Sequence, residues 1–178
     1  MHRVREWSIE KESTLQVAGK SNVNAFTCSI SSYSRRDTLL LTSNQKGGAL
    51  GLHGELVLDI ARFDCHHKLI TSDLRKTLKW KQHPMLRVKF LSLDKVPDVG
   101  QPNQTVPGWV EVELAGVKKL MQIPFHFEKG EKDVLLMNGT QVFCFSDFKL
   151  QPPTKLAGTV KIKDEFEVAF RLHLKEVY

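Results

Sequence analysis

The stretch 158–174, GTVKIKDEFEVAFRLHL, decides the fold class of this chain. Apolar and polar side chains alternate along most of its length, so the two sets point to opposite faces of an extended backbone. The apolar set consists of Val160, Ile162, Phe166, Val168, Phe170, Leu172 and Leu174. Such a pattern is typical of a strand in an antiparallel sheet with one dry and one wet face.

The same alternation recurs at 50–60, 86–90 and 117–127. Residues that favour turns separate the alternating stretches, namely Lys46-Gly47-Gly48, Pro97 to Pro107, Glu128-Lys129-Gly130-Glu131, Asn138-Gly139 and Pro152-Pro153. About seven or eight strands of this kind predict a sandwich or a closed barrel. A barrel of about eight strands is just wide enough to be filled by its own side chains or to hold one ligand.

The segment 71–81, TSDLRKTLKWK, departs from the alternation and predicts one short amphipathic helix. Leu74 and Leu78 lie about one helical turn apart, whereas basic side chains cover the opposite side. We expect Thr71 or Ser72 to cap the N-terminus of this helix.

The rest of the sequence predicts a single domain that spans residues 1–178. The chain is 41% hydrophobic and 26% charged, as ordinary globular proteins are. The stretch 31–49 is polar and poorly periodic around Leu39-Leu40-Leu41, so we expect a long loop or a hairpin extension there. No apolar run approaches the roughly 20 residues that span a bilayer. No apolar region follows the N-terminal basic residues, so no secretory signal is expected.

Positive charge is concentrated in the segment 68–89. Its basic side chains are Lys68, Arg75, Lys76, Lys79, Lys81, Arg87 and Lys89, and they exceed its one acidic side chain, Asp73, by six. That excess equals the net charge of +6 for the whole chain. A clustered excess favours an anionic partner such as a membrane surface, and a solvated face is the alternative. Nucleic acid is not an expected partner, because Trp80 is the only aromatic residue of the segment before Phe90.

No sequence motif predicts catalysis, a metal site or a cofactor. The nucleotide-binding loops and the GxSxG nucleophile motif are absent. The best metal candidate is Asp64-Cys65-His66-His67, but adjacent side chains alternate in direction and cannot all converge on one ion. We therefore predict no metal site and loop-exposed histidines. Glu111, His126 and Cys144 are the only candidates for a reactive group, and no motif supports them. Glu111 is expected on the solvent-facing side of its strand.

Several segments, taken in order, resemble the YceI-like family of polyisoprenoid-binding proteins. The segment 7–28, with GKSNVNAFTC at its end, resembles the opening strands of that family. The segment 74–90, with His83-Pro84 at its turn, resembles the family's helix and the strand that follows. VEVELAGVKK at 110–119 resembles its LTIxGVTK hairpin, and Phe148 to Asp164, with PPTKLAGTVKIKD, resembles its closing strands. The resemblance covers nearly the whole chain.

This resemblance implies an all-β fold, an antiparallel, closed, up-and-down β-barrel of the lipocalin-like kind. About eight strands and one short amphipathic helix are expected. Inside the barrel, relatives of this family hold an amphiphile in an elongated apolar cavity, with the tail inside and the head group near the mouth. The chain differs from many members at Asn22 and Asn24, where they carry histidines, and in the extension at 31–49.

The resemblance also implies a function. It is the non-enzymatic binding, storage or transport of an amphiphilic lipid: a polyisoprenoid, an isoprenoid quinone or a fatty-acyl compound. One alternative is an enzyme that acts on a lipid-like substrate in the same cavity. A second is an interaction protein that docks through its basic helix. Many relatives are exported, so a periplasmic location is expected, and no resident cofactor is expected.

Specific residues follow from the resemblance. The expected tail-lining or core residues are Leu56, Leu58, Leu86, Val88, Phe90, Met121, Ile123, Phe125, Phe143, Phe145, Phe166, Val168 and Phe170, with Leu74, Leu78 and Trp80 closing one end. The expected head-group contacts are Asn22, Asn24, Arg75 and Lys119. A turn network for the asparagines and a solvated face for the cations are the alternatives. Cys28 and Cys65 both lie in family-like stretches, and we hypothesise a disulfide between them. Three cysteines leave at least one unpaired, unless the chain forms a homodimer through it.

Overall fold

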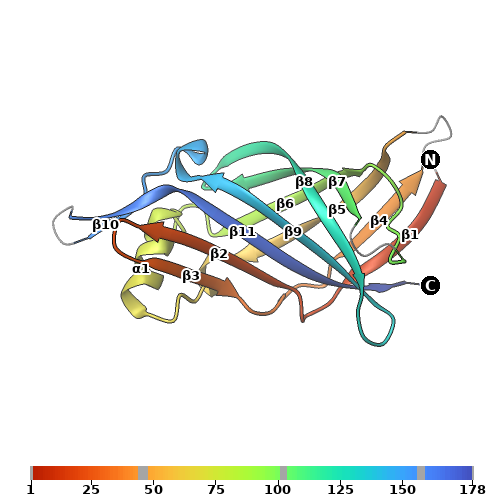
Figure 1. The fold of residues 1–178 in the computed structure, drawn as a ribbon, viewed down its shortest axis with the longest axis horizontal. Helices are drawn as coiled ribbons and strands as arrows, with labels where there is room; N and C mark the ends of the chain where they lie inside the picture. The colour runs from red at the N-terminus through yellow and green to blue at the C-terminus, as the bar shows by residue number, and fades with distance from the viewer. Residues whose placement is uncertain (1, 44–47, 101–103, 156–158, 178) are drawn as a thin grey trace.

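The structure, a computed structural model, describes residues 2–43, 48–100, 104–155 and 159–177. Figure 1 shows an elongated all-β molecule with both chain ends at one end. Its strands are β1 (His2–Ile9), β2 (Thr14–Ser21), β3 (Ala25–Ile30), β4 (Thr38–Ser43), β5 (Leu50–Asp59), β6 (Met85–Leu93), β7 (Thr105–Leu114), β8 (Val117–Lys129), β9 (Val134–Cys144), β10 (Thr154–Lys155) and β11 (Val160–Glu176). The helices are η1 (Ile60–Arg62), α1 (Lys68–Thr77) and η2 (Phe145–Phe148).

Eight of the described strands close into one antiparallel barrel, in the order β1-β4-β5-β6-β7-β8-β9-β11, with β11 returning to β1. From β4 to β9 each strand pairs with the next along the chain, which is the up-and-down connection. This finding confirms the predicted fold class. The alternation in β11 has the expected result, because Leu172 and Leu174 are buried while the charged set faces outward.

Strand β11 is long enough to have two partners on one of its edges. Its C-terminal part pairs with β1, where Leu174 lies opposite Ile9, and its N-terminal part pairs with β2. The β2–β3 hairpin therefore extends the barrel wall at one end. The wall continues through Ser29, whose N–H donates to the carbonyl of Asp64 over 2.9 Å.

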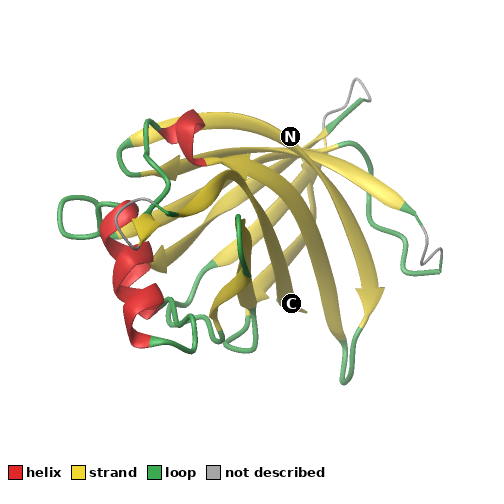
Figure 2. Ribbon diagram, turned by 60° about the vertical axis from the view of Figure 1, so that its left-hand side comes forward, coloured by secondary structure: helices red, strands yellow, loops and turns green. Residues whose placement is uncertain are grey.

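The short helix α1 lies across that same end of the barrel, which we call the α1 end (Figure 2). A disulfide between Cys28 of β3 and Cys65, three residues before the helix, ties α1 to the wall. The structure thus confirms the hypothesised cysteine pair. Among the described residues, no helix is both long enough and apolar enough to cross a membrane.

The start of α1 differs from the prediction. The helix begins at Lys68, three residues before Thr71, and its N-cap is His67, whose Nδ1 accepts a hydrogen bond from the N–H of Leu69 over 3.2 Å. Thr71 instead accepts a hydrogen bond from the N–H of Cys65, so it fixes the segment that leads into the helix. The helix ends at Thr77, just before Lys79 takes a left-handed backbone conformation.

Two further expectations differ from the structure. The stretch 31–49 is no long loop: its strand β4 forms a hairpin with β5, as one of the two expected alternatives had it, but β4 belongs to the barrel wall, with Leu39 and Leu41 fully buried between β1 and β5. Three leucines in succession hid its alternation. The expected turn at Asn138-Gly139 lies inside β9, and the glycine has another reason: a Cβ at Gly139 would lie 2.5 Å from the Phe170 ring.

Replacing Cys28 and Cys65 together by alanine is expected to lower the free energy of unfolding by about 4 kcal/mol. The cross-link joins residues 37 positions apart, and its loss returns that loop's entropy to the unfolded chain. Urea unfolding followed by circular dichroism measures the change. The matched control is Cys144→Ala, which is expected to change stability by less than about 1 kcal/mol because Cys144 is a free, half-buried thiol. A double variant as stable as the parent would contradict the cross-link.

Candidate functional site

The barrel lumen at the α1 end is lined only by apolar side chains. They come from six strands, from α1 and the residue that follows it, from the residue after η1 and from η2. The residues are Leu15, Val17, Phe63, Leu74, Leu78, Leu86, Val88, Val112, Leu114, Ile123, Phe143, Phe145, Phe166, Val168 and Phe170. The cavity left between them has a volume of about 30 Å³, where about 10–15 Å³ on the same measure holds one water molecule, so it has no room for a lipid tail. The lumen is therefore filled by its own side chains.

Phenylalanine rings supply much of that filling. Near the α1 end the Phe166 ring lies 4.5 Å from that of Phe145 and 5.7 Å from that of Phe143, centroid to centroid. Deeper in the barrel, Phe125 lies 5.6 Å from Phe170. Such tilted ring pairs stabilise a packed core beyond the area that they bury. A ligand tail can enter the lumen only if some of these rings change rotamer.

Most of the expected tail-lining residues do meet in the lumen. Those that line its cavity are Leu74, Leu78, Leu86, Val88, Ile123, Phe143, Phe145, Phe166, Val168 and Phe170. Leu56, Leu58, Phe90 and Phe125 are buried in the core away from this cavity, and Met121 is half-buried against the core. Trp80 is half-buried and packs against the core, but it lines the hollow on the outer side of α1 and not the lumen cavity. Contact with a ligand stays a prediction for all of them.

Sequence reasoning missed five residues of the cavity, namely Leu15, Val17, Phe63, Val112 and Leu114. Val112 and Leu114 alternate with Glu111 and Glu113 along β7 and so face inward, but nothing in the alternation says how far along the barrel a residue lies. Phe63 belongs to no strand, and its place in the lumen follows from the turn that η1 makes.

A second, open groove lies beside the lumen, between α1, the β2–β3 turn and the start of β11. We call it the mouth groove. It has a volume of about 410 Å³ and is lined by Ser21, Val23, Asn24, Ala25, Phe26, Ile70, Asp73, Leu74, Phe145, Pro153, Val160 and Ile162. Leu74 and Phe145 line both the groove and the lumen cavity. These two side chains are thus the wall between the surface and the lumen.

The expected head-group residues have different roles. The amide of Asn22 donates to the carbonyl of Thr159 over 2.8 Å and accepts from the N–H of Lys161 over 2.9 Å, so it forms the turn network named as its alternative. Asn24 lines the mouth groove. A head-group role for Asn24 therefore stays a prediction.

The two cations of that set also differ from each other. Arg75 donates to the carbonyls of Ala61 and Phe63 over 2.5 and 3.2 Å, which ties α1 to the end of η1. Lys119 pairs with the buried Val112, so it lies on the inward-facing side of β8, at an exposed position near the α1 end. Lys119 remains a predicted head-group contact.

Comparison with known proteins agrees on the fold. No protein-family model matches the chain, and no curated protein matches its sequence. Among solved structures, a polyisoprenoid binding domain from Saccharophagus degradans superposes with a TM-score of 0.68 at 12% identity, covering 98% of this chain and 100% of that one. Burkholderia cenocepacia BcnA gives 0.66 at 13% identity, covering 90% and 95%. A variant of the Campylobacter jejuni YCEI protein gives 0.52 at 14% identity, covering 89% and 85%.

This chain has the YceI-like barrel fold. The two more similar structures cover nearly all of it, so the likeness includes the hairpin and helix at the α1 end as well as the barrel wall. The resemblance that the sequence suggested is confirmed for the fold. The likeness concerns the fold. Which ligand fits depends on the side chains that line the lumen and the mouth groove.

The three residues considered for a reactive group in this YceI-like barrel do not lie together. Glu111, His126 and Cys144 each alternate with buried neighbours, so they face outward from three different strands. Partial burial, and then the carboxylates of Asp147 and Asp164, raise the pKa of the Cys144 thiol above its usual value. A raised pKa disfavours the thiolate, which is the nucleophilic form.

The residues of the metal candidate have structural roles. Cys65 is in the disulfide, His67 caps α1, and Asp64 accepts a hydrogen bond from the N–H of His66 over 2.8 Å. Among the described residues, no three His, Cys, Asp or Glu side chains are grouped as metal ligands would be.

Cys144 is expected to react with a maleimide more slowly than a free cysteine in a peptide at neutral pH. Its raised pKa lowers the thiolate fraction below the unfolded value, and the deficit disappears as the pH rises above the folded pKa. Mass-spectrometric labelling between pH 7 and 10 measures the rate, with Cys144→Ala as the blank. Labelling at pH 7 as fast as that of the peptide would contradict the raised pKa.

Proposed function

We propose that this protein binds a single amphiphilic lipid without catalysing its conversion, with the tail in the barrel lumen and the head group at the mouth groove. The observation that carries the proposal is the shared wall. Leu74 and Phe145 separate an open groove of about 410 Å³ from a wholly apolar lumen. Groove volumes of about 300–1,000 Å³ with mainly apolar linings are those at which proteins hold small ligands.

A tail enters the lumen only by displacing side chains that fill it. Burying the tail contributes about 0.8 kcal/mol for each CH₂ group, whereas a single enlarged side chain forced into a packed core costs about 1–3 kcal/mol. The rings must therefore move aside rather than share the space with the tail, and the gain from burial grows with the length of the tail. The proposal therefore favours ligands with long chains, such as polyisoprenoids, isoprenoid quinones or fatty-acyl compounds.

Two further observations support this choice. The solved structure from Saccharophagus degradans, which has the same fold, is described as a polyisoprenoid binding domain. Within the described chain, the lumen cavity is lined by no side chain that could act as an acid, a base or a nucleophile. Binding and storage, or transport of the bound lipid, are the roles that such a lumen suits.

The disulfide supports a location for this activity. Cys28–Cys65 ties α1 to the barrel wall, and disulfides persist in oxidising compartments but are rare in the cytosol. We therefore place the protein in the periplasm in this proposal. Subcellular fractionation followed by non-reducing gel analysis of the native protein tests it.

A Leu74→Ala variant is expected to take up a dansyl-labelled fatty acid faster than the parent. Truncating this side chain removes part of the wall between groove and lumen, at a cost of about 2–5 kcal/mol in stability. Stopped-flow fluorescence measures the uptake rate. The matched control is Leu41→Ala, a fully buried leucine of β4 that lines neither space, so it loses stability without opening a path.

The uptake rates of the two variants distinguish entry through the mouth groove from a general loosening of the barrel. Faster uptake in Leu74→Ala alone supports entry through the mouth groove. Equal acceleration in both variants would show that general loosening admits the probe. No uptake by the parent or by either variant, at probe concentrations below its micellar range, would contradict lipid binding.

A further inference from the structure

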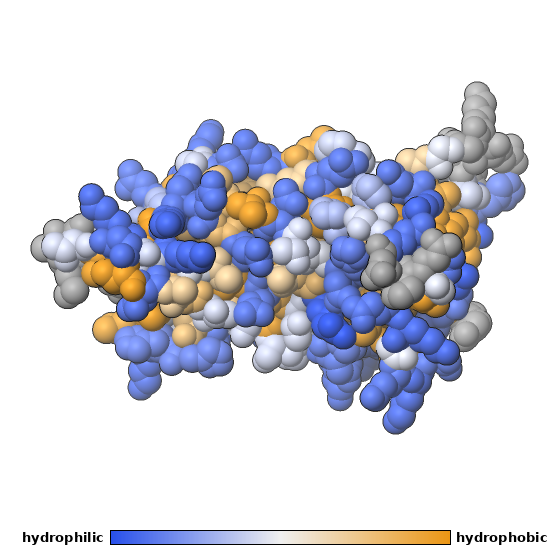
Figure 3. Space-filling model, in the orientation of Figure 1, coloured by the Kyte–Doolittle hydropathy of each residue, from blue (hydrophilic) through white to orange (hydrophobic). Residues whose placement is uncertain are grey.

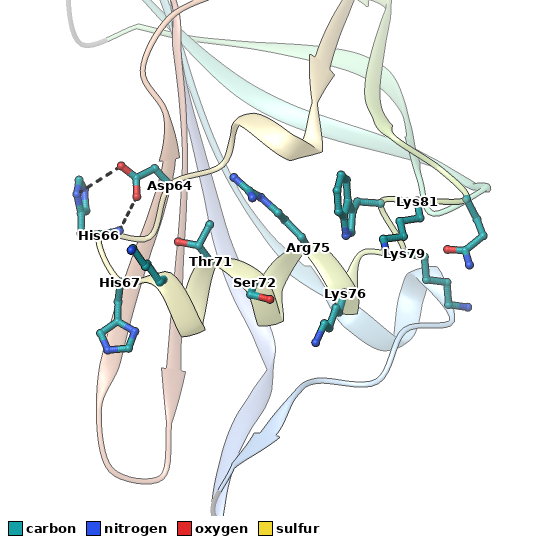
Figure 4. Close-up of a pocket in the computed structure, with 12 residues that line it drawn as sticks. Asp64, His66, His67, Thr71, Ser72, Arg75, Lys76, Lys79 and Lys81 are labelled. Atoms are coloured by element: carbon teal, nitrogen blue, oxygen red, sulfur yellow. Dashed lines mark hydrogen bonds and ion pairs between the residues drawn. The ribbon is translucent and has the colours of Figure 1, made fainter.

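The outer side of α1 and the turn after it carry a cluster of exposed cations. Lys68, Lys76, Lys79 and Lys81 are all exposed, and none of the described carboxylates forms an ion pair with them. We call these four residues the basic face. Beside them lies an open hollow of about 860 Å³, which Figure 4 shows with Lys76 and Arg75 pointing to different sides of the helix.

Exposed apolar side chains lie next to the basic face. Lys68 and Lys76 are eight residues apart and Leu69 precedes Lys76 by seven, so all three share the face of α1 turned away from the barrel. Leu69 is 65% exposed, and Val23 on the β2–β3 turn is 62% exposed. Figure 3 shows apolar surface among hydrophilic surface at this end of the molecule.

We propose that the α1 end docks on the surface of an anionic membrane. The basic face would lie against the anionic head groups, while Leu69 and Val23 enter the interfacial layer. Cations combined with apolar side chains on one helix face are the pattern by which helices lie on membranes. The hollow is open and wide, and the cations are spread along it, which suits a surface of many charges better than a single phosphate.

The distribution of charge between the two ends of the barrel favours docking by the α1 end. Of the described residues, five basic side chains and one acidic side chain, Asp64, line the hollow beside α1, whereas seven basic and four acidic side chains line the groove that contains Lys129 and Lys132. Carboxylates therefore offset less of the positive charge at the α1 end, which favours that end for contact with an anionic surface. Docking in this way would place the mouth groove beside the membrane lipids. This use of the groove rests on the proposed function, whereas the docking itself does not.

Co-sedimentation of the full chain with vesicles tests the docking. The protein is expected to bind vesicles of phosphatidylcholine with phosphatidylglycerol, to bind pure phosphatidylcholine much less, and to dissociate as salt screens the charges. Lys68→Gln with Lys76→Gln is expected to weaken binding about 30-fold, since each lysine near an anionic surface contributes about 1 kcal/mol. Leu69→Ser is expected to weaken it about tenfold through lost apolar burial.

Matched controls come from the opposite end. Lys129→Gln with Lys132→Gln removes the same charge, and Val4→Ser removes an apolar side chain that is 37% exposed on β1. Neither control is expected to change vesicle binding. Equal binding to neutral vesicles, or an equal loss in the control pair, would overturn the proposal. Release from anionic vesicles by a duplex oligonucleotide at equal phosphate concentration would overturn it in favour of a nucleic acid.

Vesicle binding and lipid uptake are measured separately, so the two proposals can fail separately. Vesicle binding with no uptake of the dansyl fatty acid would remove the lipid-binding function and support the docking surface. Uptake of the probe with no vesicle binding at low salt would do the reverse.

Discussion

The pairing of β11 with β1 at Leu174 and Ile9 closes the sheet on itself, and the interior of the molecule depends on that closure. A closed sheet has no exposed edges, and it turns every second residue of each strand toward one shared space. Because β11 continues past β1 to pair with β2, the wall is longer on one side. The β2–β3 hairpin and α1 then occupy the end that this asymmetry creates.

Several independent contacts fix α1 at that end. The Cys28–Cys65 disulfide, the hydrogen bond from Cys65 to Thr71 and the two hydrogen bonds from Arg75 all join the helix or its leading segment to the barrel wall. Leu74 can therefore serve two spaces at once, as the side chain that separates the mouth groove from the lumen. Lipid entry and membrane contact, as proposed, would use two adjoining surfaces at this end of the barrel, both of which include α1.

Alternation alone predicted an antiparallel all-β fold, either a sandwich or a barrel, because a period of two is a direct consequence of strand geometry. The closed barrel and most of the lumen residues followed from the resemblance to the YceI-like family. Sequence reasoning failed where another constraint decides the residue type. In β4 Leu40 is half-buried between the fully buried Leu39 and Leu41, but because all three are leucines the residue types show no alternation. In β9 the glycine at 139 makes room for the Phe170 ring and marks no turn. At the start of α1 a histidine caps the helix in place of the usual short polar side chain.

Whether the lumen is open or filled could not be predicted from the sequence, for a different reason. Alternation tells which side chains point inward, but whether they leave a channel depends on ring positions along the barrel axis, such as that of Phe166 between Phe143 and Phe145. The asparagine at 22 illustrates the same limit. Its type suits a ligand contact or a turn equally well, and only its distances to Thr159 and Lys161 distinguish the two.

Native mass spectrometry of the full chain, purified without detergent and followed by organic extraction, tests lipid binding most directly. A barrel that binds one amphiphile through its lumen gives a mass heavier than the chain by a single molecule, which extraction identifies as having a long apolar tail. A mass equal to that of the chain alone, together with no uptake of prenyl, quinone or acyl probes, would contradict it. The phenylalanine rings would then be a permanent core.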